Sequence, residues 1–140
     1  MYYVGRVKNM LIVSILDADS FGDELYDKMH CNLSSIIAMQ RISVVVAAGD
    51  SKGMIYRLLS EMAIEYPDVF FTILLSNDKL AYEGSSQILS LDCDICYGDP
   101  RNAKQRRRKM LIERSDIVIA RRNYCNDIRE LNRFCDIIVI

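Results

Sequence analysis

Several kinds of residue on which common protein chemistries depend are scarce in this sequence. His30 is the only histidine among the 140 residues, and it falls within an expected helix beside Cys31, with no Ser or Asp partner nearby. A Ser–His–Asp triad and a histidine-rich metal site are therefore excluded, and we expect His30 to have a structural or surface role. We predict no bound metal and no catalytic cofactor, and the composition singles out no catalytic residue.

Long hydrophobic runs are also missing. The run Met10–Leu16 is too short to span a membrane. No small-residue cleavage site accompanies it, so we expect neither a membrane anchor nor a signal peptide. The five cysteines are odd in number and unevenly spaced, which favours a reduced, cytoplasmic protein. Cys93 and Cys96 have CxxC spacing, but no second pair completes a zinc site, and we expect both in the core.

The chain as a whole carries almost no net charge, but one segment is strongly basic. The formal net charge of −1 argues against a general nucleic-acid-binding protein. Residues 101–122, however, carry a net charge of +7, which leaves −8 for the rest of the chain. This basic pole indicates an anionic ligand or partner. Its cations are Arg101, Lys104, Arg106, Arg107, Arg108, Lys109, Arg114, Arg121 and Arg122.

Apolar, strand-like segments alternate with helix-like segments along the chain. Runs such as Ile42–Ala48 and Val69–Leu75 are apolar on both faces, which is typical of strands covered by helices on both sides. We therefore predict a single α/β domain over all 140 residues: a three-layer Rossmann-like fold with a mainly parallel sheet of five or six strands flanked by helices. The other expected strands are Met10–Leu16, Asp92–Tyr97, Asp116–Ala120 and Cys135–Ile140, and the expected helices are Phe21–Gln40, Met54–Tyr66, Arg101–Arg114 and a short one near residue 128.

Ligands of such folds bind beyond the carboxyl ends of the strands. One candidate loop there is Ala47–Met54, which follows a buried strand and opens a helix. Its glycines, Gly49 and Gly53, allow close approach of an anion to free N–H groups at the helix start, and Asp50 and Ser51 lie between them. The alternative is a plain strand-to-helix turn in which Ser51 caps the helix.

The basic helix offers a second candidate site. Arg107 is four residues from Ala103 and from Leu111, so it shares the apolar stripe that faces the sheet. An arginine placed there needs an anion or a carboxylate to compensate its burial, which makes Arg107, together with Arg108, a candidate ligand contact. The alternative is an arginine whose stem packs while its head reaches water, in a helix whose other cations are solvated.

Two short motifs add a family resemblance. Glu65-Tyr66-Pro67 precedes an apolar strand, and Arg107 precedes Ser115-Asp116 and another apolar strand. This combination resembles the SLOG superfamily of Rossmann-like proteins, especially its YpsA-like branch. Arg107 and Ser115 fall on family positions, and Gly53 matches the family glycine loop approximately. The resemblance implies a nucleotide or nucleotide-derived ligand.

Three functions follow as hypotheses. The first is a module, such as a sensor or a ligand-sequestering protein in bacterial or phage conflict, that binds a nucleotide-derived small molecule. Its expected ligand contacts are Gly49, Asp50, Ser51, Gly53, Arg107, Arg108 and Ser115. The second is a nucleotide N-glycosidase assisted by a loop carboxylate such as Asp17 or Asp50. The third is an antagonist or immunity protein that acts through protein contacts.

Ile55 stands where the family carries an aspartate, which favours binding over catalysis. We expect no membrane partner and no nucleic acid, and a homodimer or a higher homo-oligomer.

Overall fold

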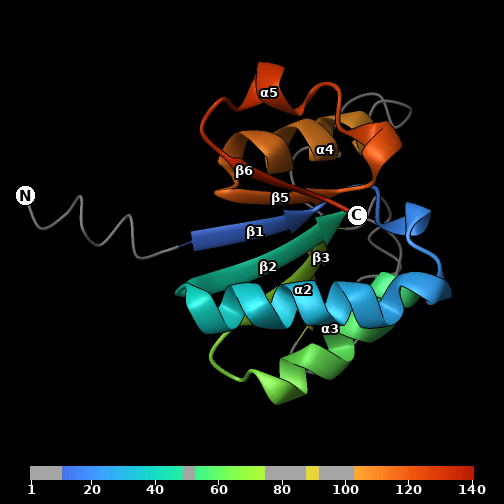
Figure 1. The fold of residues 1–140 in the computed structure, drawn as a ribbon, viewed down its shortest axis with the longest axis vertical. Coiled ribbons are helices and arrows are strands. Elements are labelled where there is room, and N and C mark those ends of the chain that lie inside the picture. Colours follow the sequence, from blue (N-terminus) through green and yellow to red (C-terminus); the bar gives the residue numbers. More distant parts are fainter. Residues whose placement is uncertain (1–10, 49–52, 75–87, 92–102) are drawn as a thin grey trace, which may run out of the picture.

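The computed structural model describes residues 11–48, 53–74, 88–91 and 103–140 (Figure 1). The strands are β1 (Leu11–Ile15), β2 (Ile42–Ala48), β3 (Phe70–Leu74), β4 (Ile88–Leu91), β5 (Ile117–Ala120) and β6 (Asp136–Val139). The α-helices are α2 (Tyr26–Met39), α3 (Met54–Glu65), α4 (Ala103–Arg114) and α5 (Ile128–Leu131). Short 3-10 helices occupy Ala18–Ser20, Asp23–Leu25 and Arg122–Tyr124.

The strands form one sheet in the order β4-β3-β2-β1-β5-β6, and every neighbouring pair is parallel. The chain starts in the middle of the sheet at β1 and builds outward to β4. It then returns to the other side of β1 to add β5 and β6. This arrangement confirms the predicted Rossmann-like α/β fold, and it places the topological switch point between β1 and β5.

One strand of the sheet was missed by the sequence analysis. We expected a strand at Asp92–Tyr97 and none at Ile88–Leu91, which forms β4. Residues 92–97 lie outside the described part of the chain. The strand was missed because it has only four residues and lies at the edge of the sheet, where a short apolar run gives little signal.

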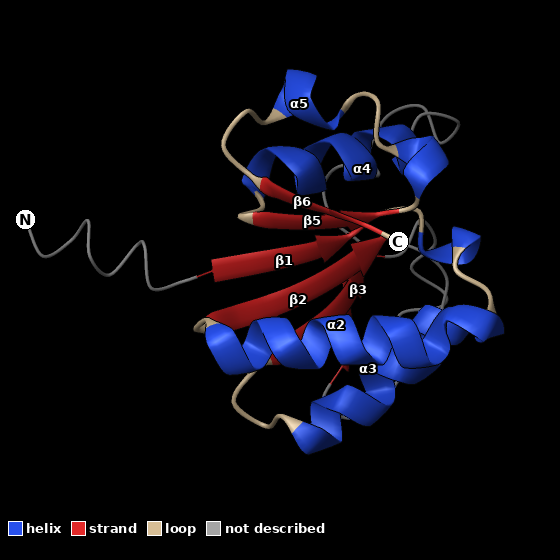
Figure 2. Ribbon diagram, viewed as in Figure 1, coloured by secondary structure: helices blue, strands red, loops and turns tan. Residues whose placement is uncertain are grey.

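Helices cover both faces of the sheet, as Figure 2 shows. The face under α2 and α3 carries the larger apolar cluster, to which β1 contributes Val13 and Ile15 and α3 contributes Leu58. The opposite face packs against α4 and α5 through a smaller cluster that includes Val118 from β5 and Ile112 from α4. Successive strand residues thus point to opposite helical layers, which explains why the strands are apolar on both sides.

Local sequence explains where the helices begin and end. Met29, Leu33 and Ile36 of α2 are buried at helical spacing and face the larger cluster. Gly53, just before α3, has a φ of 95°, a left-handed conformation that favours glycine. The helix α3 ends one residue before Tyr66, and Pro67 follows, as the sequence predicts.

Candidate functional site

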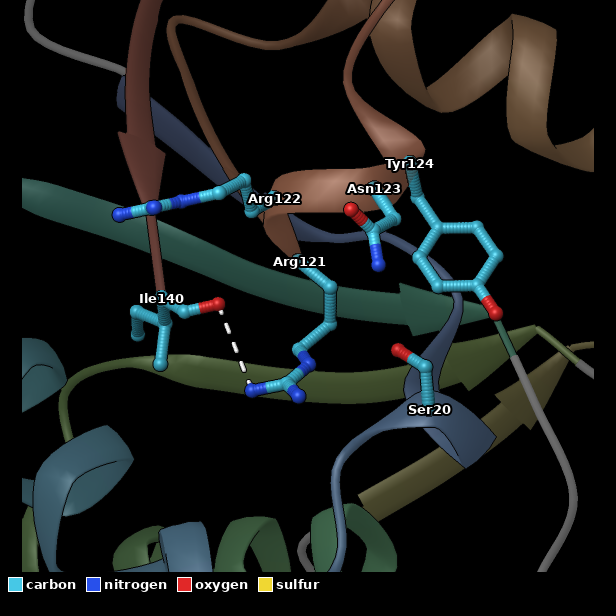
Figure 3. A pocket seen from close by; sticks show the side chains of 6 residues that line it. All are labelled: Ser20, Arg121, Arg122, Asn123, Tyr124 and Ile140. Carbon is cyan, nitrogen blue, oxygen red and sulfur yellow. Dashed lines mark hydrogen bonds between the residues drawn. The ribbon is translucent and has the colours of Figure 1, made fainter.

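A pocket of about 430 Å³ opens at the carboxyl edge of the sheet (Figure 3). Its walls come from segments far apart in sequence: the turn after β1, the 3-10 helix after β5, and the residue after β6. The first two lie beside the switch point between β1 and β5, and the third follows β6, the outer neighbour of β5. The lining residues are Ser20, Arg121, Arg122, Asn123, Tyr124 and Ile140.

The side chains of the pocket are mainly polar and carry two positive charges. In Figure 3 the Arg121 side chain extends into the space between Ile140 and Ser20, with its guanidinium turned towards Ile140, whereas Arg122 extends past β6. The Arg121 guanidinium donates a long hydrogen bond of 3.4 Å to the backbone oxygen of Ile140. It also lies 5.9 Å from the centre of the Phe21 ring. Arg121 is thus held by an oxygen and an aromatic ring.

The wall after β1 is a tight turn held by its own hydrogen bonds. Asp17 has a φ of 52° and a ψ of 57°, a left-handed conformation that costs a non-glycine residue free energy. Its backbone oxygen accepts bonds from the Ser20 backbone N–H, at 2.8 Å, and from the Ser20 hydroxyl, at 2.5 Å. This turn fixes the position of Ser20 at the pocket.

Arg108 of α4 lies where the walls meet the helical layer. Its Nε atom donates to the Asp17 carboxylate at 3.1 Å, one terminal nitrogen donates to the Asp127 carboxylate, and the other donates to the Tyr124 backbone oxygen. Burial lowers the pKa of the guanidinium, but the bonds with Asp127 and Asp17 outweigh this effect, so its net pKa is raised. Arg108 therefore stays charged and satisfied by acceptors of the protein itself.

Arg107 and Ser115 are buried in the helical layer next to the sheet. The Arg107 side chain is 3% exposed, which confirms that it lies on the sheet-facing stripe of α4. The Ser115 hydroxyl donates its single hydrogen to the backbone oxygen of Leu111, so the Ser14 hydroxyl of β1 donates to Ser115. Ser115 thus joins the end of α4 to the centre of the sheet, and its hydroxyl is already engaged on both sides.

The predicted site residues are only partly brought together. Gly49, Asp50 and Ser51 lie outside the described residues. Gly53 is exposed just before α3, and a Cβ atom there would meet nothing within 4 Å. Arg108 touches the pocket wall through Tyr124, but it does not line the pocket. A ligand contact by any of these residues stays a prediction.

Sequence reasoning selected no ligand-binding residue from the loops after β1 and β5. The missed residues are Ser20, Arg121, Asn123 and Tyr124. The sequence did hold an indication of this site, because Arg121 and Arg122 directly follow a buried strand and belong to the basic pole. What was missing was the knowledge that β1 and β5 are neighbours, which brings the two loops together.

The described part of the chain contains neither a metal-binding cluster nor a membrane-spanning helix. No group of three or more His, Cys, Asp or Glu residues there is arranged to hold a metal ion. None of the helices formed by these residues is long and apolar enough to cross a membrane.

The fold and the pocket together define a class: a Rossmann-like α/β domain with a cationic pocket at its topological switch point. Comparisons with protein-family models, with curated proteins and with solved structures find no match to this chain.

Proposed function

We propose that this chain is a binding module for a nucleotide or a nucleotide-derived anion, and that the pocket beside β1 and β5 is its binding site. The observation that carries the proposal is the Arg121 side chain, which extends into a pocket at the switch point of a parallel sheet. Phosphate-bearing ligands of doubly wound folds bind at this place.

The chemistry of the lining supports an anion that also carries hydrogen-bonding groups. Arg121 offers a forked set of N–H donors, which matches phosphate and carboxylate oxygens. The Asn123 amide supplies both a donor and an acceptor, and the Ser20 hydroxyl does the same. Tyr124 is 49% exposed at the rim and offers a flat ring against which a base can stack.

The size of the pocket fits a small ligand. Its volume of about 430 Å³ lies in the lower part of the range of about 300–1,000 Å³ that is usual for small-molecule sites. A mononucleotide or a similar molecule is better matched to this space than a long dinucleotide. The resemblance to the SLOG superfamily supports the same class of ligand.

A thermal-shift screen with nucleoside monophosphates, cyclic nucleotides and ADP-ribose tests this function. A ligand present at about 100 times its dissociation constant stabilises the folded state by about 2.7 kcal/mol. For a chain of this size, that corresponds to a rise in Tm of about 5–10 °C. We expect at least one ligand of the panel to produce such a rise, and Arg121→Ala to abolish it.

Arg41→Ala is the matched control for that variant. It removes the same charge from an exposed residue that precedes β2, at the amino edge of the sheet, opposite the pocket. The control is expected to keep the ligand response of the wild-type protein. Equal loss in both variants would mean that net charge, and not the pocket, governs binding.

The alternative of a nucleotide N-glycosidase is less well supported. Asp17, one of the two loop carboxylates considered for that role, is paired with Arg108 and does not line the pocket, and Asp50 lies outside the described residues. Release of free base from a nucleoside monophosphate panel separates the two functions, because a binding module releases none. A cytoplasmic location, a homodimer, a conflict-related role and the antagonist alternative also remain proposals. A stable protein partner without any nucleotide response would favour the antagonist.

A further inference from the structure

We propose that Arg108 is a positioning residue, which ties together two walls of the pocket, the turn after β1 and the segment after β5, without touching the ligand. This inference rests on the proposed function, because it assigns Arg108 a role in ligand binding. Whether Arg108 holds the two walls in place can, however, be measured without any ligand. A positioning role differs from the ligand contact that the sequence predicts.

The first wall is held through Asp17. Arg108 binds the carboxylate of this residue, whose side chain is only 15% exposed. The backbone oxygen of Asp17 holds both the N–H and the hydroxyl of Ser20, which lines the pocket. Because Asp17 adopts a left-handed conformation, the ion pair also helps to retain a turn that is unfavourable for an aspartate. One side of the guanidinium therefore fixes the Ser20 wall.

The second wall is held through the segment after β5. Two terminal nitrogens of Arg108 bind the Asp127 carboxylate and the backbone oxygen of Tyr124. Tyr124 lines the pocket, and Asp127 immediately precedes α5. A planar fork with several donors can engage both walls at once, which the single ammonium of a lysine does not do in the same geometry.

The charged groups around Arg108 favour a positioning role over direct contact with an anionic ligand. Arg108 is surrounded by two carboxylates and a carbonyl oxygen, and its side chain is 19% exposed. An anion that approached this guanidinium would have to displace Asp17 or Asp127. Within the described part of the chain, Arg121 in contrast has a long hydrogen bond to the Ile140 oxygen and lies near the Phe21 ring, and it lines the pocket, so it is better placed than Arg108 to meet a ligand.

The first test needs no ligand. The sequence contains no tryptophan, so Tyr124→Trp places a single fluorescent reporter on the second wall while leaving the backbone oxygen that Arg108 binds. In this background Arg108→Gln is expected to increase acrylamide quenching of the reporter. Arg108→Lys is expected to behave like Arg108→Gln. In the protein without the reporter, Arg108→Gln is expected to speed amide hydrogen exchange about tenfold in residues 17–20 and 121–127, with β1 and β5 unchanged.

The control is Arg114→Gln, which removes an exposed arginine from the same helix. It is expected to alter neither quenching nor exchange. The proposal is overturned if Arg108→Gln leaves both walls as they are in the wild-type protein, or if it loosens the whole chain uniformly.

The second test uses the direction of a change in affinity, with AMP and ADP-ribose as probes. Asp17→Asn and Asp127→Asn each remove a negative charge near the pocket, and asparagine tolerates the left-handed backbone of residue 17. If Arg108 positions the walls, each variant weakens probe binding about tenfold, since an ordered pocket is lost. If Arg108 contacts the anion, or if charge alone matters, each variant strengthens binding.

Asp68→Asn, an exposed residue between α3 and β3, controls for the change in net charge. It is expected to leave probe affinity unchanged. Tighter binding by Asp17→Asn and Asp127→Asn overturns the positioning role. If neither probe binds the wild-type protein, the proposed function loses its support from these probes, while quenching and exchange still decide whether Arg108 holds the walls.

Discussion

On the face of the sheet under α2 and α3, the buried side chains are apolar, whereas the face under α4 and α5 mixes a small apolar cluster with polar groups. Among the described residues, the buried polar side chains are Ser14, Thr72, Arg107 and Ser115. Ser14 and Thr72 are both in register with Val46, whose side chain belongs to the smaller cluster, so they share its face. Arg107 and Ser115 come from α4 and the residue after it.

This difference indicates a division of roles between the two faces. The larger cluster supplies the apolar burial that stabilises a domain of this size. The smaller cluster leaves room for hydrogen bonds that fix the helical layer on the sheet, and Arg108 extends this polar framework to the pocket walls. Substitutions on the first face should therefore affect stability alone, and those around Arg108 should affect the pocket.

The largest effect is expected from Leu58→Ala on the first face. Leu58 is fully buried in the larger cluster, and removing a buried leucine side chain costs about 2–5 kcal/mol of unfolding free energy. Denaturant unfolding measures this loss, and ligand affinity of the folded protein should not change. Ile64→Ala on the same helix is the control: Ile64 is 74% exposed, so its change should stay within about 0.5 kcal/mol.

Asn132→Asp tests the polar framework of the second face. The Asn132 amide donates to the backbone oxygens of Ile112, at 2.8 Å, and Ser115, at 2.9 Å. A carboxylate there replaces the amide donor by an oxygen that faces two carbonyl oxygens. We expect this change to lower the free energy of unfolding by about 2–3 kcal/mol at neutral pH. The measurement is denaturant unfolding.

Asn126→Asp makes the same chemical change at an exposed position of the preceding loop and is expected to be nearly neutral. An equal loss of unfolding free energy in Asn132→Asp and Asn126→Asp would show that the hydrogen bonds of Asn132 make no particular contribution to stability. A smaller loss in acid, where the introduced carboxyl group regains a hydrogen to donate, would support the proposed geometry.

A smaller effect is expected at the hydroxyl pair. Ser115→Ala leaves the buried Ser14 hydroxyl without its acceptor, which should lower the unfolding free energy by about 1–3 kcal/mol. Removal of both hydroxyls should cost less than the sum of the two single changes, because neither partner is then left unsatisfied. Additive losses in this double-mutant cycle would contradict the pairing.

The smallest effect concerns a polar contact at the surface of the first face. The hydrogen bond from Tyr26 to Glu61, burial and the charge of Glu61 raise the pKa of Tyr26 from 10.0 to about 12. The stability that this phenol contributes is therefore present below pH 10.0 and is lost as the pH rises towards about 12. The difference in Tm between the wild-type protein and Tyr26→Phe should shrink over this interval. A Tm difference that stays constant over this pH interval would contradict a contribution of the Tyr26 phenol to stability.

Much of the fold was predictable because its signals are local. The spacing of Met29, Leu33 and Ile36 indicated α2, and strands apolar on both faces indicated a parallel sheet. The burial of Arg107 also followed from helical spacing. The edge strand Ile88–Leu91 was missed because four residues carry too weak a pattern.

The pocket was less predictable because it depends on contacts between distant segments. Arg108 binds Asp17, 91 residues away, and Asp127, 19 residues away, and no local pattern links these positions. The meeting of Ser20 with Tyr124 likewise requires β1 and β5 to be neighbours, which follows only from the strand order. Sequence reasoning pointed to the edge of the sheet at which this pocket lies, but it had no means of selecting which loops share a pocket.

The central claim is that an anion binds in the pocket beside β1 and β5. Backbone NMR of the isotope-labelled protein, titrated with AMP and ADP-ribose, tests it most directly. We predict saturable shifts of the Ser20, Arg121, Asn123 and Tyr124 amides, which Arg121→Ala abolishes and Arg41→Ala retains. Shifts centred on Gly53 and the start of α3, with the pocket amides unchanged, would contradict the claim.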